Sequence, residues 1–274
     1  MLNYNLADIL SLSRKICLPQ DVVAEIPAVW ANLEMAAISS HINAIVKPDT
    51  RENAYKALKD LFDDADSKGF KMLVSYLYAA LHTREIYVQK GIDEDIFVDT
   101  MKCFSRQVNE HLMAFGYYGY DRGSWTVRHL SAQMFRLGIL EFEICKDTST
   151  LSVHIPSDAV MTNEALAQSY NLAKSFFANQ EVEYTGIFCE TWLLSPALKE
   201  LLPHGSRILN FQKDYEIIKL IEGEKEVMKW VYKREYSDLN QLPETTHLQR
   251  SIKRHLLAGG SIGEAVGQYK EKEL

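Results

Sequence analysis

Two short segments carry a histidine and two carboxylates with the alternating spacing of strands. Residues 139–145 (ILEFEIC) and 150–156 (TLSVHIP) alternate apolar with polar side chains, which predicts two strands. The short polar connection 146–149 favours an antiparallel hairpin, and matching the apolar faces sets Glu141 opposite His154 and Glu143 opposite Ser152. Glu141 could then orient the His154 imidazole and make it a general base. The same pattern also fits an ordinary polar face in contact with solvent.

Pro156 interrupts the second of these strands. Proline has no backbone N–H to give to a sheet, so the strand has to end or turn away there. The loop 157–161 then leads to Thr162, which has the side chain of a helix N-cap. Amide groups at such a helix start suit a phosphate. No glycine-rich loop accompanies them, and Asp158 would repel an anion.

The other reactive side chains have structural explanations. The cysteines are widely spaced, which indicates free thiols in a reducing compartment; they are Cys17, Cys103, Cys145 and Cys189. Cys189 could pair with His154 in a cysteine hydrolase, although no local signature supports this. Ser195 before Pro196 is typical of a helix start rather than of a nucleophile. The histidines lack zinc spacing, so no metal is expected.

The hydrophobic period changes once along the chain. Residues 6 to about 115 follow a helical period, and the segment GYYGYDRGSW (116–125) ends it. Strands and helices alternate beyond this point, with long paired strands expected at 207–221 and 226–235 and a helix at 247–258. The glycines of GGSIGEAVG indicate a helix end and a flexible tail. This pattern predicts an α+β protein with an all-α domain over 1–115 and a mixed α/β sheet domain over 116–274.

The length and net charge of the chain limit its number of domains and its possible partners. A chain of 274 residues and 31.4 kDa can form one large core or two smaller ones. A net charge of −7 argues against nucleic acid as a partner. No signal peptide and no membrane-spanning segment are expected, so the sequence predicts a cytoplasmic protein with no membrane partner. The oligomeric state stays open.

Several segments together resemble a family of bacterial GNAT-like acyltransferases that combine an all-helical N-terminal domain with a GNAT-like C-terminal domain. The resemblance covers about residues 115–267 and is carried by YDRGSWTVRHLSAQMFRLGILEFEI, LSVHIPSDA, QSYNLAKSFF, FCETWLLSPALKELLP and LPETTHLQRSIKRHLLAGG. It implies a GNAT-type sheet that binds acetyl-CoA or another acyl-CoA where two parallel strands separate.

The resemblance also implies the residues around the acyl-CoA. They are Ile155, Pro156, Ser157, Asp158, Ala159, Thr162 and Asn163 after one strand, and Cys189 and Trp192 on its partner 183–192. The expected function is acyl-CoA-dependent N-acyl transfer to a small-molecule amine, with His154 and Glu141 as catalytic residues. The usual Q/R-x-x-G-x-G/A pyrophosphate loop is absent. An alternative is therefore a weakly active or inactive GNAT-fold protein with a ligand-binding or regulatory role.

Overall fold

The computed structural model describes residues 4–270, apart from the side chains of residues 63 and 64. Contacts divide the chain into two compact units, Met1–Leu137 and Gly138–Leu274. Each unit has buried hydrophobic side chains of its own, so each can be described by itself.

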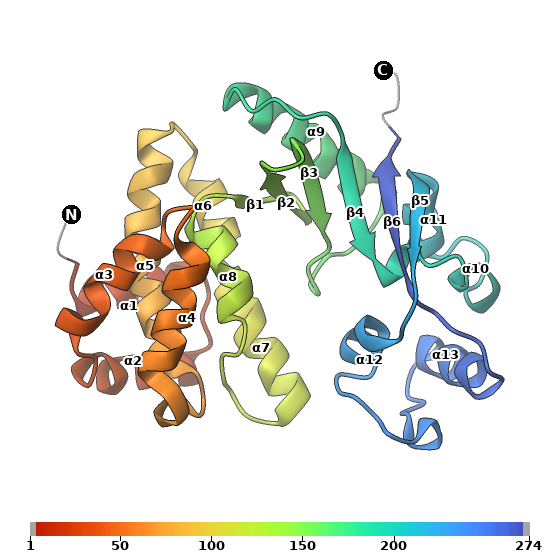
Figure 1. The fold of residues 1–274 in the computed structure, drawn as a ribbon, viewed down its shortest axis with the longest axis horizontal. Coiled ribbons are helices and arrows are strands. Elements are labelled where there is room, and N and C mark those ends of the chain that lie inside the picture. Colours follow the sequence, from red (N-terminus) through yellow and green to blue (C-terminus); the bar gives the residue numbers. More distant parts are fainter. Residues whose placement is uncertain (1–3, 271–274) are drawn as a thin grey trace. The chain divides into compact units, whose positions relative to one another are not determined.

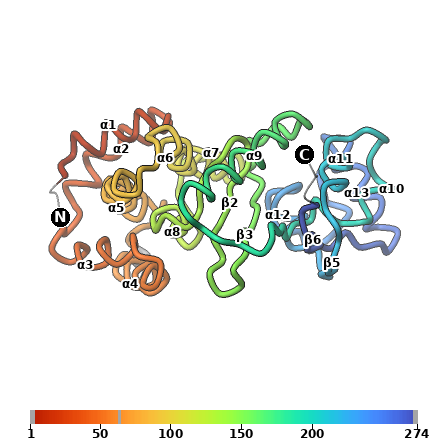
Figure 2. Tube along the Cα trace, turned by 90° about the horizontal axis from the view of Figure 1, so that it is seen from above, coloured from red at the N-terminus to blue at the C-terminus, as the bar shows by residue number. Residues whose placement is uncertain are grey.

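The first unit is a set of helices around one long central helix, α5. Within the described residues its elements are α1 (Leu6–Lys15), α2 (Gln20–Ala31), α3 (Met35–Ile45), α4 (Arg51–Phe62), η1 (Asp63–Asp66), α5 (Phe70–Gln89), α6 (Glu94–Met101), α7 (Cys103–Phe115), α8 (Gly123–Leu130) and β1 (Met134–Leu137). α5 is buried at every position from Met72 to Thr83. It contacts α1, α2, α3, α4, α6 and α8, and Figure 2 shows it enclosed by its neighbours. A helix that is buried on every side belongs at the centre of its domain.

The segment after α7 belongs to the helical unit. α8 packs against α4 and α5, and β1 packs against α6. The Arg136 amide donates a hydrogen bond to the Thr100 hydroxyl at 2.9 Å. The change of hydrophobic period near residue 116 therefore coincides with the end of α7. The boundary between the compact units lies later, between Leu137 and Gly138.

Gly69 lies where two segments of the helical unit approach each other closely. The Tyr120 amide donates to the Lys68 carbonyl at 2.8 Å. Gly69 has a φ of +73°, and a Cβ atom on it would lie 1.8 Å from the Tyr120 carbonyl oxygen. Both the backbone conformation and the available space therefore require glycine at this position.

The second unit contains a mixed sheet. Its strands are β2 (Leu140–Cys145), β3 (Thr150–His154), β4 (Ile187–Thr191), β5 (Tyr215–Ile221) and β6 (Glu264–Tyr269). Within this unit the strand order is β2-β3-β4-β6-β5. β3 and β4 are parallel, whereas β2–β3, β4–β6 and β5–β6 are antiparallel. A helical first part followed by a mixed sheet confirms the predicted α+β class.

The two faces of this sheet differ in chemistry. Helix α9 (Asn163–Asn179) packs on one face, where Phe142 makes edge-to-face ring contacts with Tyr170 and Phe177. We call this the α9 face (Figure 1). Strand alternation and the pairing registers put polar side chains on the opposite face; these include Glu141, Glu143, Ser152, His154 and Glu190.

Short helices follow β4 and β5. They are η2 (Trp192–Leu194), α10 (Leu198–Leu201), α11 (Arg207–Lys213), α12 (Lys225–Val231), η3 (Leu239–Gln241) and α13 (His247–Leu257). α13 begins with a capping box formed by Thr246 and Gln249, and the Thr162 side chain caps α9, as their sequences predict. None of the helices among residues 4–270 is long and apolar enough to cross a membrane.

Three expectations for the second unit are wrong. Residues 207–213 form α11, capped by the Ser206 side chain, so the strand there begins only at Tyr215. Residues 225–231 form α12 rather than a strand. The glycine-rich segment after α13 contains β6, which lies between β4 and β5 instead of forming a tail.

Ser195 does not cap a helix. Its hydroxyl donates to the buried Ile262 carbonyl, and α10 starts only at Leu198. The sequence correctly gave Ser195 a structural role but assigned it the wrong partner.

Candidate active site

β3 and β4 separate shortly after they begin to pair. Their parallel register contains only Leu151 with Ile187 and Ser152 with Phe188. Beyond these pairs, β3 remains paired with β2 up to His154, and β4 pairs with β6 from Phe188 to Thr191. Figure 1 shows the two strands diverging toward their ends. Pro156, which is buried, follows the end of β3, so the separation occurs where the sequence predicted an interrupted strand.

A histidine–carboxylate pair stands at this separation. The predicted hairpin register is confirmed, with Glu141 opposite His154 and Glu143 opposite Ser152. The carboxylate in contact with the imidazole is the diagonal one, because His154 Nε2 lies 3.0 Å from Glu143 Oε2. An ionised carboxylate only accepts hydrogen bonds, so in a neutral imidazole this contact requires the hydrogen on Nε2 and the lone pair on Nδ1. The two side chains are 21% and 12% exposed, which leaves the pair accessible to a substrate.

Glu141 is 2% exposed and lies directly across from His154. Its predicted role, to orient the His154 imidazole as a general base, stays a prediction. Sequence reasoning missed Glu143 as the contacting side chain. The alternation of the sequence already places Glu143 on the same face of the hairpin as His154. Side chains on paired strands also contact diagonal neighbours, so a contact between Glu143 and His154 could have been expected.

The segment after β3 forms a tight turn and then starts a long helix. The Ala159 amide donates to the Pro156 carbonyl at 2.9 Å, and Ser157 and Asp158 are exposed within this turn. The Thr162 hydroxyl accepts the Ala165 amide at 3.2 Å, and Asn163 begins α9. The structure therefore gathers the predicted residues of this segment, from Ile155 to Asn163, between the separating strand and a helix N-terminus. The positive end of the α9 dipole is directed toward this turn.

On the β4 side, the predicted side chains are mostly buried. Cys189 is fully buried on the α9 face and pairs with Gly267 of β6, and Trp192 is 9% exposed in η2. Burial raises the pKa of the Cys189 thiol far above its usual range. On the α9 face of the sheet, the Tyr170 and Tyr215 hydroxyls share a hydrogen bond. The Tyr170 ring also stacks on the Tyr269 ring, with the ring centroids 3.9 Å apart. Burial also raises the pKa of both hydroxyls, so this cluster is protonated at neutral pH.

Two family models match the chain in the order of its two units. The N-acyltransferase N-terminal domain matches residues 7–132, and the GNAT-like C-terminal domain matches residues 104–269. The chain belongs to the GNAT-like acyltransferases.

Solved structures of acyltransferases have the same fold as this GNAT-like acyltransferase. One, an acyltransferase in complex with decanoyl-CoA and teicoplanin, has a TM-score of 0.82 at 22% identity, with 98% of this chain and 89% of that chain covered. A mutant acyltransferase in complex with octanoyl-CoA has a TM-score of 0.82 at 21% identity, with 99% and 90% covered. Among curated protein sequences, none matches this chain.

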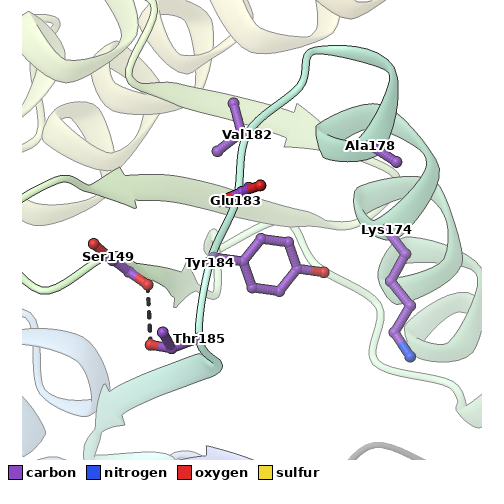
Figure 3. Close-up of a pocket in the computed structure, with 7 residues that line it drawn as sticks. All are labelled: Ser149, Lys174, Ala178, Val182, Glu183, Tyr184 and Thr185. Carbon is purple, nitrogen blue, oxygen red and sulfur yellow. Dashed lines mark hydrogen bonds between the residues drawn. The ribbon is translucent and has the colours of Figure 1, made fainter.

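A cavity of about 610 Å³ lies at the other end of the β3–β4 pair (Figure 3). It is lined by Ser149, Lys174, Ala178, Val182, Glu183, Tyr184 and Thr185. Ser149 and Thr185 precede β3 and β4, and the Thr185 hydroxyl donates to the Ser149 carbonyl at 3.1 Å. The strands pair at this end and separate at the opposite one. The cavity is therefore distinct from the candidate active site of the GNAT-like acyltransferase.

Among residues 4–270, no group of three or more His, Cys, Asp or Glu side chains is arranged to hold a metal ion. The candidate site consists of the separated strands, the histidine–carboxylate pair and the start of α9.

Cys189 is expected to resist alkylation in the folded protein. A buried thiol with a raised pKa supplies almost no reactive thiolate, whereas Cys17 is exposed. Peptide mass spectrometry after brief iodoacetamide treatment should find Cys17 modified and Cys189 intact. Acyl transfer should survive this treatment. Rapid labelling of Cys189 with loss of activity would instead support a cysteine hydrolase.

Proposed function

We propose that this protein transfers an acyl group from an acyl-CoA to the amine of a small-molecule acceptor. The observation that carries the proposal is the separation of β3 from β4 immediately after Ser152 and Phe188, with the His154–Glu143 pair at that point. Separated parallel strands offer backbone groups to an extended ligand. The acyltransferases of the same fold bind octanoyl-CoA and decanoyl-CoA, which supports a donor of this kind, including one with a medium-length acyl chain.

The donor would bind along the separated strands and the start of α9. The pantetheine would lie against the β3 segment that ends at Ile155 and Pro156, and the pyrophosphate would lie near residues 157–163. Amides at a helix N-terminus can hold phosphate without a glycine-rich loop. Asp158 and Glu164 are acidic, so local amides have to provide most of this binding. Cys189 and Trp192 would contribute through the β4 backbone and through shape, because both side chains are buried.

In the proposed reaction, the lone pair of the amine attacks the thioester carbonyl carbon. A protonated amine has no lone pair, so His154 Nδ1 first accepts one proton from the acceptor, directly or through a water. Glu143 holds the ring by accepting from Nε2 and stabilises the imidazolium that forms. The C–N bond forms, the C–S bond breaks, and the thiolate takes the second amine proton. The products are an amide, free CoA and one proton, which His154 returns to solvent.

The tetrahedral intermediate places a negative charge on the carbonyl oxygen. A backbone amide on the separated edge of β3 or β4 is suitably placed to donate a hydrogen bond to it, since these edges no longer pair with each other. One such donor lowers a barrier of this kind by about 3 kcal/mol.

Donor binding is testable by thermal unfolding with acetyl-CoA, octanoyl-CoA and decanoyl-CoA. A ligand at 100 times its Kd stabilises the native protein by about 2.7 kcal/mol, which corresponds to a rise in Tm of roughly 5–10 °C. We expect such a rise with at least one of these donors. We also expect release of free thiol, measured with a thiol reagent, when an amine is added. Unchanged Tm with all of them would contradict the proposal.

The second candidate function is ligand binding without turnover. The absence of a Q/R-x-x-G-x-G/A loop favours it, because that loop normally binds the pyrophosphate. A rise in Tm with an acyl-CoA, together with no thiol release across a wide panel of amines, would favour this candidate over catalysis.

A further inference from the structure

Glu190 occupies the position on β4 that His154 occupies on β3. The last parallel pair joins Ser152 to Phe188, and the next side chains on the same face are His154 and Glu190. Each of the two residues lies two positions beyond that pair on its own strand, and therefore on the same face of the sheet. A histidine and an exposed carboxylate therefore flank the opening between the strands, one from each side.

Glu190 lies near another carboxylate, that of Glu264 on β6. Glu264 of β6 has its pKa raised by burial and then by the carboxylates of Glu226 and Glu190. Lys229 opposes this effect, and its Nζ lies 3.7 Å from Glu226 Oε2. Lys219 on β5 faces the same side, but Val266 of β6 separates its position from that of Glu190. A cationic group beside Glu190 would lower the repulsion among these carboxylates.

This carboxylate is poorly suited to hold the reacting amine. A carboxylate stabilises an ammonium group in its protonated form, whereas the amine that attacks has to be neutral. The reacting nitrogen therefore belongs near His154. Glu190 on the opposite strand can hold a different positive charge of the same acceptor.

We propose that Glu190 positions an acceptor that carries a second ammonium group, so that the preferred acceptors are diamines or larger polyamines. This inference rests on the proposed acyl transfer at the same opening. One nitrogen of the acceptor reacts beside His154, and the other remains protonated and donates to the Glu190 carboxylate. Glu190 is thus a positioning residue whose effect should fall on KM more than on kcat.

The test compares 1,5-diaminopentane with 1-aminopentane as acceptors of the octanoyl group of octanoyl-CoA. The wild-type protein should favour the diamine in kcat/KM. In Glu190→Gln, the ratio of the two kcat/KM values should fall by about tenfold, the size expected for loss of one charge-assisted hydrogen bond. The matched control is Glu216→Gln, an exposed carboxylate on the same face of the edge strand β5, which should keep the wild-type ratio.

A second measurement requires no turnover. The diamine should raise the Tm of the CoA-loaded wild-type protein more than 1-aminopentane does, and Glu190→Gln should abolish the difference. Equal effects of the two amines on the wild-type protein would overturn the inference. Equal losses in Glu190→Gln and Glu216→Gln would overturn it as well. Diamine binding without acyl transfer to any amine would count against the proposed function while leaving the role of Glu190 supported.

Discussion

Replacing His154 by alanine is expected to lower kcat/KM for acyl transfer by about 100- to 10,000-fold, the usual contribution of a positioned general base. The substitution removes the nitrogen that accepts the amine proton, whereas the strand separation and the start of α9 remain in place. The Kd of the acyl-CoA should therefore change little. Steady-state rates with saturating donor, together with donor titration by calorimetry, measure the two quantities separately.

Three further variants make this test specific. Glu143→Gln keeps the size of the side chain and an oxygen that can accept from Nε2, but it removes the negative charge. We expect a loss of about 10- to 100-fold because the imidazolium that forms during the reaction is no longer stabilised by a carboxylate. Glu141→Gln tests the predicted catalytic role of the neighbouring buried carboxylate. His204→Ala, an exposed histidine of the same unit, should be neutral. Wild-type turnover in His154→Ala would eliminate the assignment of this residue as the base.

Replacing Gly69 by alanine is expected to cost more than about 3 kcal/mol of stability, because two penalties add. An L-residue in the left-handed region costs about 1–2 kcal/mol. The new methyl group would also lie 1.8 Å from the Tyr120 carbonyl oxygen, so the backbone has to move and the hydrogen bond from the Tyr120 amide to the Lys68 carbonyl is strained. Urea unfolding followed by circular dichroism measures the change.

Gly91 is the matched control for this substitution. It has a φ of +64°, but no atom lies within 4 Å of its hypothetical Cβ. Gly91→Ala should therefore show only the conformational penalty of about 1–2 kcal/mol. Equal destabilisation by the two variants would mean that the contact with Tyr120 contributes nothing.

The sequence predicted correctly those parts of the fold that are determined by residues close together in the chain. Apolar and polar alternation in residues 140–145 and 150–154 gave the hairpin and its register, and Thr162 and Thr246 marked two helix starts. The failures concern α11, α12 and β6, and at β6 local preference conflicts with packing. β6 contains Gly267, which weakens a strand on its own, yet Leu194 and Tyr215 lie so close that a side chain there would clash. The segment 226–235 was expected to be a strand, but its first residues belong to α12.

For the segments around the candidate site, the sequence predicted the strand hairpin and its end better than the contacts between side chains. Pro156 located the end of β3, and the polar alternation located His154. Contact with Glu143 depends on side-chain direction across the strand pair, which alternation does not specify. Glu190 was overlooked because its position relative to His154 follows from the register of β3 with β4, and a parallel register between distant segments cannot be read from either segment.

The position of β6 has a consequence for the order in which the second unit folds. β4 and β5 share no pairing of their own, and each bonds to β6, which follows every other strand in the chain. During synthesis, the hairpin of β2 and β3 can form early, but β4 keeps an unpaired edge until residues 264–269 have emerged. Unpaired strand edges promote aggregation. Nascent chains stalled before residue 264 should therefore depend on chaperones, whereas the helical unit can already fold.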